Sequence, residues 1–338
     1  MVQSRPEKRL RRALLAAVLS LGFLAAGSGA ATGTDAGLTT LCQAPRDTHG
    51  RERTVHVPEQ TAGRLLRTTR SYRGPCAEYG TAIPRGDGFL RGYTQRSGHR
   101  PVAMGVTFTP ATLRNLPTAV SDGTYCFDKD GDGRLDLHTE CAVGHEGVLD
   151  MPEAFLENVD TPFNWSLTNY NPMGHIPPGV YDVPHFDVHF YIQSLAGRNA
   201  IRTGPCPVVT DCDDYARAKI PVPGRYVDPV FKDLDAVEPA MGNHLIDDTA
   251  PEFHGVPFTH TWIYGAYDGE VSFYEAMITT KWFEDLRTGA VADRCVPFRQ
   301  PRAWRIAGWY PTTYCMEYRE NRNDYVVSMN DWVYRTAS

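Results

Sequence analysis

The clearest pattern in the chain is a series of short runs in which apolar and polar residues alternate, beginning near Gly88. Gly, Pro, Asn and Asp interrupt these runs, and the chain holds 30 glycines and 25 prolines. Alternation with a period of two is typical of β-strands, and little of the sequence has helical periodicity. The pattern therefore predicts a β-rich α+β fold, either an antiparallel sheet or a partly closed barrel. The few short helices are expected at 110–116, 152–158, 211–219 and 280–287.

Two β-hairpins stand out late in the chain. The runs 258–266 and 271–279 flank Asp268-Gly269, the preferred pair for a two-residue type I′ turn. Regular pairing around this turn would place Trp262 opposite Glu275 and His260 diagonal to Glu275 on the same face. A second hairpin is expected from 313–318 and 325–334. The sheet should thus contain at least five antiparallel strands.

The N-terminal segment has the layout of a signal peptide. Five basic residues within the first twelve precede an apolar run at 13–26 and small residues at 27–31, which predicts cleavage near residue 30. Residues 31–84 are rich in Thr, Arg, Gly and Pro, and we expect an irregular extension there. Residues 85–338 are expected to form a single β-rich domain. No later apolar segment is long enough to span a bilayer, so we expect a secreted or extracytoplasmic protein.

Charge and missing motifs narrow the function. Loss of residues 1–30 would remove five basic residues and one acidic residue, which moves the formal charge from −6 to −10. An acidic protein is a poor partner for nucleic acid or for anionic membranes. No Gly-x-Ser-x-Gly, Gly-x-Gly-x-x-Gly or phosphate-loop motif occurs, which disfavours serine-hydrolase, dinucleotide and ATP chemistry. A small-molecule ligand and a homo-oligomer both stay open.

The cysteines indicate disulfides. All eight follow the expected cleavage site, and an even number in an exported chain is typical of a disulfide framework. Eight cysteines allow 105 pairings. Pairing of sequence neighbours predicts Cys42–Cys76, Cys126–Cys141, Cys206–Cys212 and Cys295–Cys315, with free buried thiols as the alternative.

The densest group of histidines lies in the run 183–192. On a strand, Phe186, Val188 and Phe190 share one face, while His185, Asp187, His189 and Tyr191 share the other. Two imidazoles and a carboxylate in register suggest a metal or proton-transfer site. His185 and His189 are about 13 Å apart on a strand, so one ion can take only one of them, together with Asp187; we favour His189. The alternative is a polar face whose histidines only form hydrogen bonds within the sheet.

Further ligands must come from other segments. His244, in Met-Gly-Asn-His, is the best external candidate, and the predicted hairpin supplies Glu275 and, less readily, His260. Imidazole and carboxylate together are a common ligand set for zinc and iron.

These segments resemble a family of uncharacterised exported bacterial proteins that carry one domain of unknown function. The shared motifs are Asn-Pro-Met-Gly-His-Ile-Pro-Pro-Gly-Val-Tyr at 171–181, Pro-His-Phe-Asp-Val-His-Phe-Tyr at 184–191, Met-Gly-Asn-His at 241–244 and the strand pair at 258–279. The chain departs from the family pattern at Ile176 and Ala276. The resemblance implies a single domain and no particular reaction. It points to a shared polar set of His175, His185, Asp187, His189, His244 and Glu275.

A separate acidic segment has the spacing of a calcium loop. Aspartates occupy loop positions 1, 3, 5 and 9, Gly133 provides position 6, and Arg134 stands at position 7, where such loops use a backbone carbonyl. The calcium ligands would thus be Asp128, Asp130, Asp132, Arg134 and Asp136. Position 12 is Thr139, with Glu140 next, so a true EF-hand is not expected. The alternative is an acidic surface turn.

The leading hypothesis is an exported metal-binding protein with a transition metal such as Zn²⁺ on the sheet and a structural Ca²⁺ in the loop. Whether it is an enzyme stays open. The alternative is a non-catalytic envelope or secreted protein whose polar cluster organises the fold or an interface.

Overall fold

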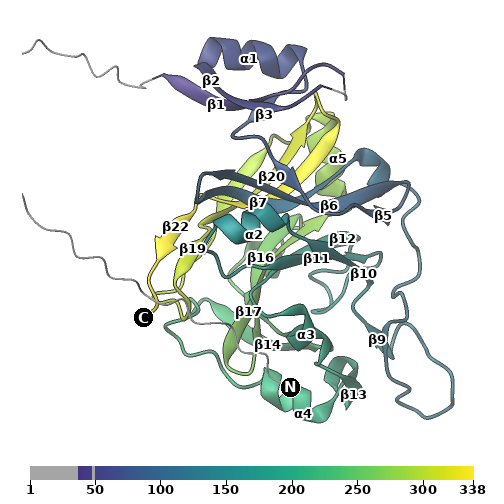
Figure 1. The fold of residues 1–338 in the computed structure, drawn as a ribbon. Coiled ribbons are helices and arrows are strands. Elements are labelled where there is room, and N and C mark those ends of the chain that lie inside the picture. The colour runs from purple at the N-terminus through teal and green to yellow at the C-terminus, as the bar shows by residue number, and fades with distance from the viewer. Residues whose placement is uncertain (1–36, 48–49) are drawn as a thin grey trace, which may run out of the picture. The chain divides into compact units, whose positions relative to one another are not determined.

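The computed structural model describes residues 37–47 and 50–338. The predicted signal peptide, residues 1–30, and residues 31–36 lie outside this part of the chain. Two seven-stranded antiparallel sheets dominate the fold, and Figure 1 shows β6 and β7 of one sheet lying across β11 and β12 of the other. We call them the β12 sheet and the β7 sheet.

The β12 sheet holds the histidine-rich strand near its middle. Its strands, in spatial order, are β10 (His145–Asp150), β11 (Trp165–Asn171), β12 (His185–Tyr191), β17 (Glu270–Thr279), β16 (His260–Tyr267), β15 (Gly242–Asp247) and β14 (Phe231–Glu238). All of these neighbours are antiparallel.

The β7 sheet covers one face of the β12 sheet. Its order is β18 (Arg294–Pro297), β20 (Thr313–Arg319), β21 (Asp324–Asn330), β7 (Arg100–Phe108), β6 (Gly88–Ser97) and β4 (Glu78–Tyr79), and β5 (Ile83–Arg85) also pairs with β6. Among the described strands each sheet is an open path with two edges. The β-rich α+β prediction is confirmed, as a pair of sheets and not a closed barrel.

The main hydrophobic core lies between the two sheets. Phe108 of β7 packs against Phe186 of β12 and, edge to face, against Phe283. Tyr325 and Val327 of β21 are fully buried in the same cluster. Complete burial of such a side chain stabilises the fold by about 1.5–3 kcal/mol, so this interface fixes which face of β12 points inward.

The helices are short and lie at the margins. They are α1 (Glu59–Thr68), α2 (Glu153–Asn158), α3 (Leu195–Asn199), α4 (Cys212–Ala218) and α5 (Thr280–Thr288), with 3₁₀ turns at Pro110–Leu113, Pro207–Val209 and Pro251–His254. α5 begins where the Thr279 hydroxyl accepts from the Trp282 amide and ends at the left-handed Gly289. The predicted helices at 152–158, 211–219 and 280–287 are confirmed. The segment 110–116 forms only a 3₁₀ turn at its start, because the backbone becomes extended at Arg114.

The prediction of an irregular extension at 31–84 is wrong over most of its described length. Residues 38–73 contain a three-stranded sheet, β2 (Arg53–Pro58), β1 (Leu38–Gln43) and β3 (Tyr72–Arg73), together with α1. β4 and β5 then join the β7 sheet before the expected domain boundary at 85.

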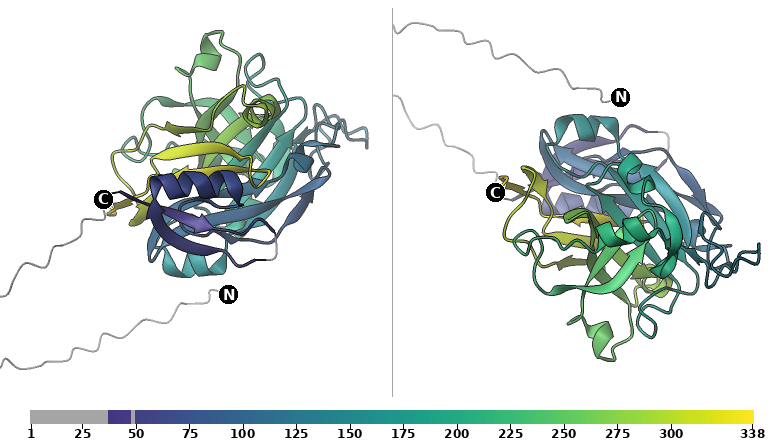
Figure 2. Two further views of the ribbon diagram at one scale, coloured as in Figure 1. Left: turned by 90° about the horizontal axis from the view of Figure 1, so that it is seen from above. Right: turned by 90° about the horizontal axis from the view of Figure 1, so that it is seen from below.

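Contacts from the far end of the chain anchor this N-terminal sheet. The Asn321 side chain donates to the backbone carbonyls of Thr69 and Ser71, and Arg322 pairs with Glu52 at 2.8 Å. Figure 2 shows α1, seen from above, beside the yellow strands of the C-terminal region. Since these partners are some 250 residues away in sequence, local composition gave no sign of them.

The hairpin of β16 and β17 has the predicted turn but a different register. Asp268 and Gly269 both have positive φ, as a type I′ turn requires. A bulge between Gly265 and Ala266 then shifts the pairing by one residue. Ile263, not Trp262, therefore faces Glu275, and His260 faces Ile278. A one-residue shift moves a side chain to the other face. His260 accordingly lies away from Glu275 and is hydrogen-bonded to the Tyr314 hydroxyl at 2.8 Å.

Two small two-stranded sheets and four disulfides complete the described fold. β8 (Tyr125–Cys126) pairs with β9 (Cys141–Ala142), β19 (Gly308–Tyr310) pairs with β22 (Val333–Arg335), and β13 (Thr203–Cys206) lies just before α4. The predicted second hairpin is formed by β20 and β21. All four predicted disulfides are present, Cys42–Cys76, Cys126–Cys141, Cys206–Cys212 and Cys295–Cys315. No helix in the described ranges is long and apolar enough to cross a membrane.

Candidate metal centre

β12 is buried on both faces. Phe186, Val188 and Phe190 enter the main core, as the alternation predicted. On the opposite face His185, Asp187 and His189 are exposed by only 0%, 4% and 1%. This face is therefore not a solvated polar surface, and its charges need partners inside the protein.

Two small hydrophobic clusters enclose the polar row on this second face. Tyr191 and Phe273 belong to one cluster, and the Phe273 ring lies 4.8 Å from the His189 ring. Tyr181 and Phe258 belong to the other, and Phe258 lies 5.5 Å from His185. The polar side chains thus occupy a strip between two apolar patches, where the low dielectric makes unpaired charges costly.

Three of the predicted residues form what we call the pocket triad: His175, His185 and Asp187. The Nε2 atom of His185 lies 3.2 Å from Asp187 Oδ1, and the Nε2 atom of His175 lies 3.3 Å from Asp187 Oδ2. The two imidazole rings are nearly perpendicular, with centroids 4.7 Å apart. Two imidazoles from different segments therefore converge on one carboxylate.

Backbone carbonyls set the orientation of both imidazoles. His175 Nδ1 lies 2.8 Å from the Ile176 carbonyl, and His185 Nδ1 lies 2.7 Å from the Val183 carbonyl. A carbonyl only accepts, so each Nδ1 carries the proton and donates. Each Nε2 is then left to face Asp187 with either a lone pair or a second proton. Metal-binding histidines are oriented by this kind of hydrogen bond.

The loop that carries His175 is held close to the strand. Gly174 has φ +75°, and a Cβ there would lie 1.9 Å from the Tyr181 carbonyl, so a larger residue would displace the loop. Just before it, Asn171 faces His185 across the β11–β12 pairing. The Asn171 amide donates to Asp187 Oδ2 at 2.6 Å and fixes the carboxylate.

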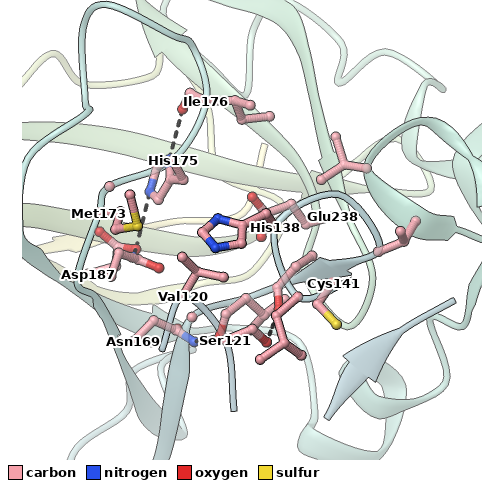
Figure 3. Close-up of a pocket in the computed structure, with 18 of the residues that line it drawn as sticks. Val120, Ser121, His138, Cys141, Asn169, Met173, His175, Ile176, Asp187 and Glu238 are labelled. Atoms are coloured by element: carbon pink, nitrogen blue, oxygen red, sulfur yellow. Dashed lines mark hydrogen bonds and ion pairs between the residues drawn. The ribbon is translucent and has the colours of Figure 1, made fainter. Parts of the chain in front are cut away.

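His175 and Asp187 of the pocket triad line a cavity of about 280 Å³. Its lining also includes His138, Glu238 and His244. Figure 3 shows His175 between Ile176 and Asp187, with its two contacts drawn as dashed lines. His175 is the most accessible member, with a quarter of its side chain exposed. A small ligand in the cavity would therefore meet this triad from the His175 side.

The charges of the pocket triad favour an ionised carboxylate. Burial would raise the pKa of Asp187, but His185 and His175 outweigh it and hold that pKa well below its usual value. Burial would likewise lower the pKa of His175, yet the Asp187 charge and hydrogen bond raise it to about 9. Without a metal ion, the triad thus holds a proton on His175 at neutral pH.

The other three predicted residues form a second group, the buried triad: His189, His244 and Glu275. His189 and Glu275 are direct cross-strand partners, with 3.3 Å between Nε2 and Oε2. His244 Nε2 lies 3.9 Å from the same oxygen. Burial lowers the pKa of His189 to about 3. Burial, together with the charges of Asp187 and Glu238, raises the pKa of Glu275 well above its usual value.

The six residues predicted from the sequence thus lie in two groups of three, each with ligand atoms within 4.8 Å of one another. His185 and His189 fall in different groups, as strand geometry required. Asp187 is grouped with His185, however, and not with His189 as we favoured from the sequence. Sequence reasoning missed Asn171 and Glu238. Asn171 lies within the 171–181 motif, but its contact with Asp187 depends on the strand register.

The aspartate loop, residues 126–141, lies between β8 and β9 and extends to one side of the molecule (Figure 1). Asp128 and Asp130 come together with Glu140, which follows loop position 12 and was not among the predicted ligands. Asp132 and Asp136 are not in this group, nor is Arg134. The Asp132 carboxylate accepts from the Arg134 backbone amide, and the Asp136 carboxylate accepts from the His138 backbone amide.

Comparison with family models, with curated proteins and with solved structures finds no match for this chain.

Proposed function

We propose that this protein binds a divalent transition metal, with zinc the first choice, at the pocket triad. The observation that carries the proposal is the shared arrangement of His175 and His185. Both use Nδ1–H on a backbone carbonyl, and both direct Nε2 at Asp187.

The spacing of the donor atoms supports this proposal. Zinc binds imidazole nitrogen and carboxylate oxygen at about 2.0–2.2 Å, so neighbouring ligands of a tetrahedral ion lie about 3.3–3.5 Å apart. The N···O separations of 3.2 and 3.3 Å are close to that value. A small shift of His175, on its loop, would admit an ion.

The pocket gives the proposed site a catalytic character. Zinc sites with four protein ligands are usually structural, whereas catalytic sites keep three ligands and leave a position for water or substrate. Here His175 and Asp187 line a cavity of about 280 Å³, which suits a small molecule, and His185 is fully buried beside them. A metal ion there would polarise a bound group or activate a water. Glu238, which lines the same cavity, supplies a nearby carboxylate.

The competing function is a non-catalytic exported protein. In that case His175, protonated by its raised pKa, and His185 form a plain ion-pair network with Asp187. The network would then organise the 171–184 loop and bind nothing.

Metal analysis separates these two functions. Full-length protein, expressed for export so that its disulfides form and purified without a histidine tag, should contain bound zinc after dialysis. Asp187→Asn should abolish the share held by the pocket triad. His260→Ala, which removes a half-buried histidine on the opposite face of the same sheet, should not change metal content. Zinc that is lost equally from all variants, or absent from wild type, overturns the proposal.

A calcium ion in the aspartate loop is a second proposal. It rests on Glu140, which is 5% exposed and reaches across the loop to Asp128 and Asp130. Glu140 Oε1 accepts from the Lys129 amide and Oε2 from the Asp136 amide, so its carboxylate is already aimed at the loop centre. The Cys126–Cys141 disulfide keeps the two ends of the loop together.

Export is proposed on the N-terminal pattern. Four disulfides are consistent with an oxidising compartment. N-terminal sequencing of the mature protein should begin shortly after residue 30, and an intact residue 1 in the extracytoplasmic fraction would refute cleavage. The resemblance to exported bacterial proteins with a domain of unknown function is part of the same proposal.

A further inference from the structure

We infer that the buried triad, His189, His244 and Glu275, is a second transition-metal site, separate from the pocket triad. The observations for this inference concern the buried triad alone. With the pocket triad, it would make a centre that holds two ions, which goes beyond the proposed function.

The first observation is that the buried triad contains polar atoms without hydrogen bonds. His189 is 1% exposed, and neither of its ring nitrogens forms a hydrogen bond. Glu275 is equally buried, and its Oε2 atom, although 3.3 Å from His189 Nε2, forms none either. Buried polar atoms are nearly always paired in folded proteins, so three such atoms on two facing side chains point to a missing ligand.

The second observation is the orientation of His244. Its Nδ1 lies 2.9 Å from the Ala236 carbonyl and must donate to it, which leaves Nε2 directed at Glu275. This repeats the arrangement of His175 and His185 on a third histidine. The repeated pattern is that of ligands whose second nitrogen is held by the backbone.

The third observation is that the sheet leaves space for the triad to converge. Gly265 stands opposite His244 on the neighbouring strand, so no side chain separates His244 from β17. A Cβ on Gly265 would lie 2.1 Å from the Phe273 ring. Because that position is glycine, Phe273 can pack beside both His189 and His244 and cover the triad from water.

The donor set selects the class of ion. Two imidazoles and a carboxylate suit zinc and similar transition metals, whereas calcium and magnesium prefer oxygen ligands. One such ion would satisfy a His189 nitrogen, the Glu275 oxygen and His244 Nε2 together. His244 lines the cavity, but His189 and Glu275 do not. An ion here is reached less easily than one in the pocket triad, so we expect it to exchange more slowly.

Zinc stoichiometry of the full-length exported protein tests the inference. After reconstitution with zinc and removal of the excess, wild type should hold two equivalents. Asp187→Asn should hold one, and Glu275→Gln should also hold one. His260→Ala, which removes a half-buried histidine outside both triads, should hold two. EDTA should remove one equivalent quickly from wild type and the other at least tenfold more slowly, and the slow fraction should be missing in Glu275→Gln.

The outcomes distinguish the two proposals. If wild type holds one equivalent that Asp187→Asn loses and Glu275→Gln keeps, the second site is wrong and the pocket site stands. If the single equivalent is lost only in Glu275→Gln, the second site stands and the pocket site is wrong. His244→Gln gives an independent check in case Glu275→Gln does not fold, because His244 is at the cavity edge. Wild-type zinc content in a folded His244→Gln variant overturns the inference.

Discussion

The pocket triad and the aspartate loop are both candidate ion sites, yet they are built in opposite ways. The pocket triad joins a strand residue pair to His175, which lies on a loop, and its members are mostly buried. The aspartate loop draws all its oxygens from the fourteen residues between two bonded cysteines, and most of its aspartates are exposed.

The difference lies in what holds each site together without an ion. In the aspartate loop, Asp128 accepts from the Gly131 and Gly133 amides and Asp130 from the Asp132 amide, so the carboxylates are already satisfied locally. In the pocket triad the carboxylate is held by side chains that only the folded sheet brings together. An ion in the pocket triad should therefore be coupled to folding more strongly than an ion in the loop.

The largest effect should come from the pocket carboxylate. Asp187→Asn keeps the shape of the side chain but removes the charge between two imidazoles, and we expect zinc affinity at the pocket triad to fall by roughly a thousandfold or more, since loss of mere supporting residues already costs about 10–100-fold. Asp182→Asn is the control, because Asp182 lies on the same loop and accepts only from the Gly179 amide. Competition with a chromophoric chelator measures both. Equal affinities in the two variants would mean that Asp187 is not a ligand.

The next effect is a pH dependence of the metal-free protein. The pKa of His175 is raised from 6.5 to about 9 in the folded state. The protonated imidazole therefore stabilises the fold fully below pH 6.5, and this stability is lost as the pH rises through about 9. Urea denaturation in EDTA at pH 6.5 and 9.5 should show wild type losing on the order of 2–3 kcal/mol more than His175→Gln. An identical pH response in both proteins would show that the His175–Asp187 ion pair does not contribute to the stability of the fold.

Calcium should have an effect of about the same size. At 100 times its dissociation constant, calcium would stabilise the fold by about 2.7 kcal/mol if it binds only the native state. Two matched variants sharpen the test, because Asp130 and Asp132 each accept one backbone amide but only Asp130 belongs to the group with Glu140. Thermal melts should show that Asp130→Asn loses the calcium response and Asp132→Asn keeps it. Loss in both, or in neither, would contradict the proposed geometry.

The smallest effect should come from the residue that supports the carboxylate. Asn171→Ala removes the amide that donates to Asp187 Oδ2, and we expect zinc affinity at the pocket triad to fall by about 10–100-fold. Asn169→Ala is the matched control, since Asn169 lies two residues away on β11, lines the same cavity and donates to the Val143 carbonyl. Isothermal titration with zinc distinguishes them. A loss of zinc affinity in Asn169→Ala that equals or exceeds the loss in Asn171→Ala would show that the cavity, not the carboxylate, governs binding.

The sequence by itself determined the features that depend on local chemistry. The alternation in β12 fixed which side chains share a face, because successive Cβ atoms point to opposite sides of a strand. Asp268-Gly269 determined the hairpin turn, and the cysteine spacing predicted all four disulfides. The candidate residues His175, His185, Asp187, His189, His244 and Glu275 were also named from sequence, although not their grouping.

Tertiary structure decided what depends on register and on remote contacts. The bulge at Gly265 moved His260 away from Glu275. A local sequence pattern does not predict such a bulge, because the bulge depends on tertiary packing, here that of the Phe273 ring against Gly265. The N-terminal sheet is anchored by contacts with Asn321 and Arg322, which lie far along the chain. The division into two triads follows from the pairing of β12 with β11 and with β17, which sets Asp187 beside Asn171 and His189 opposite Glu275. Alternation along one strand shows which side chains share a face. The neighbouring strands determine which side chains on that face come into contact.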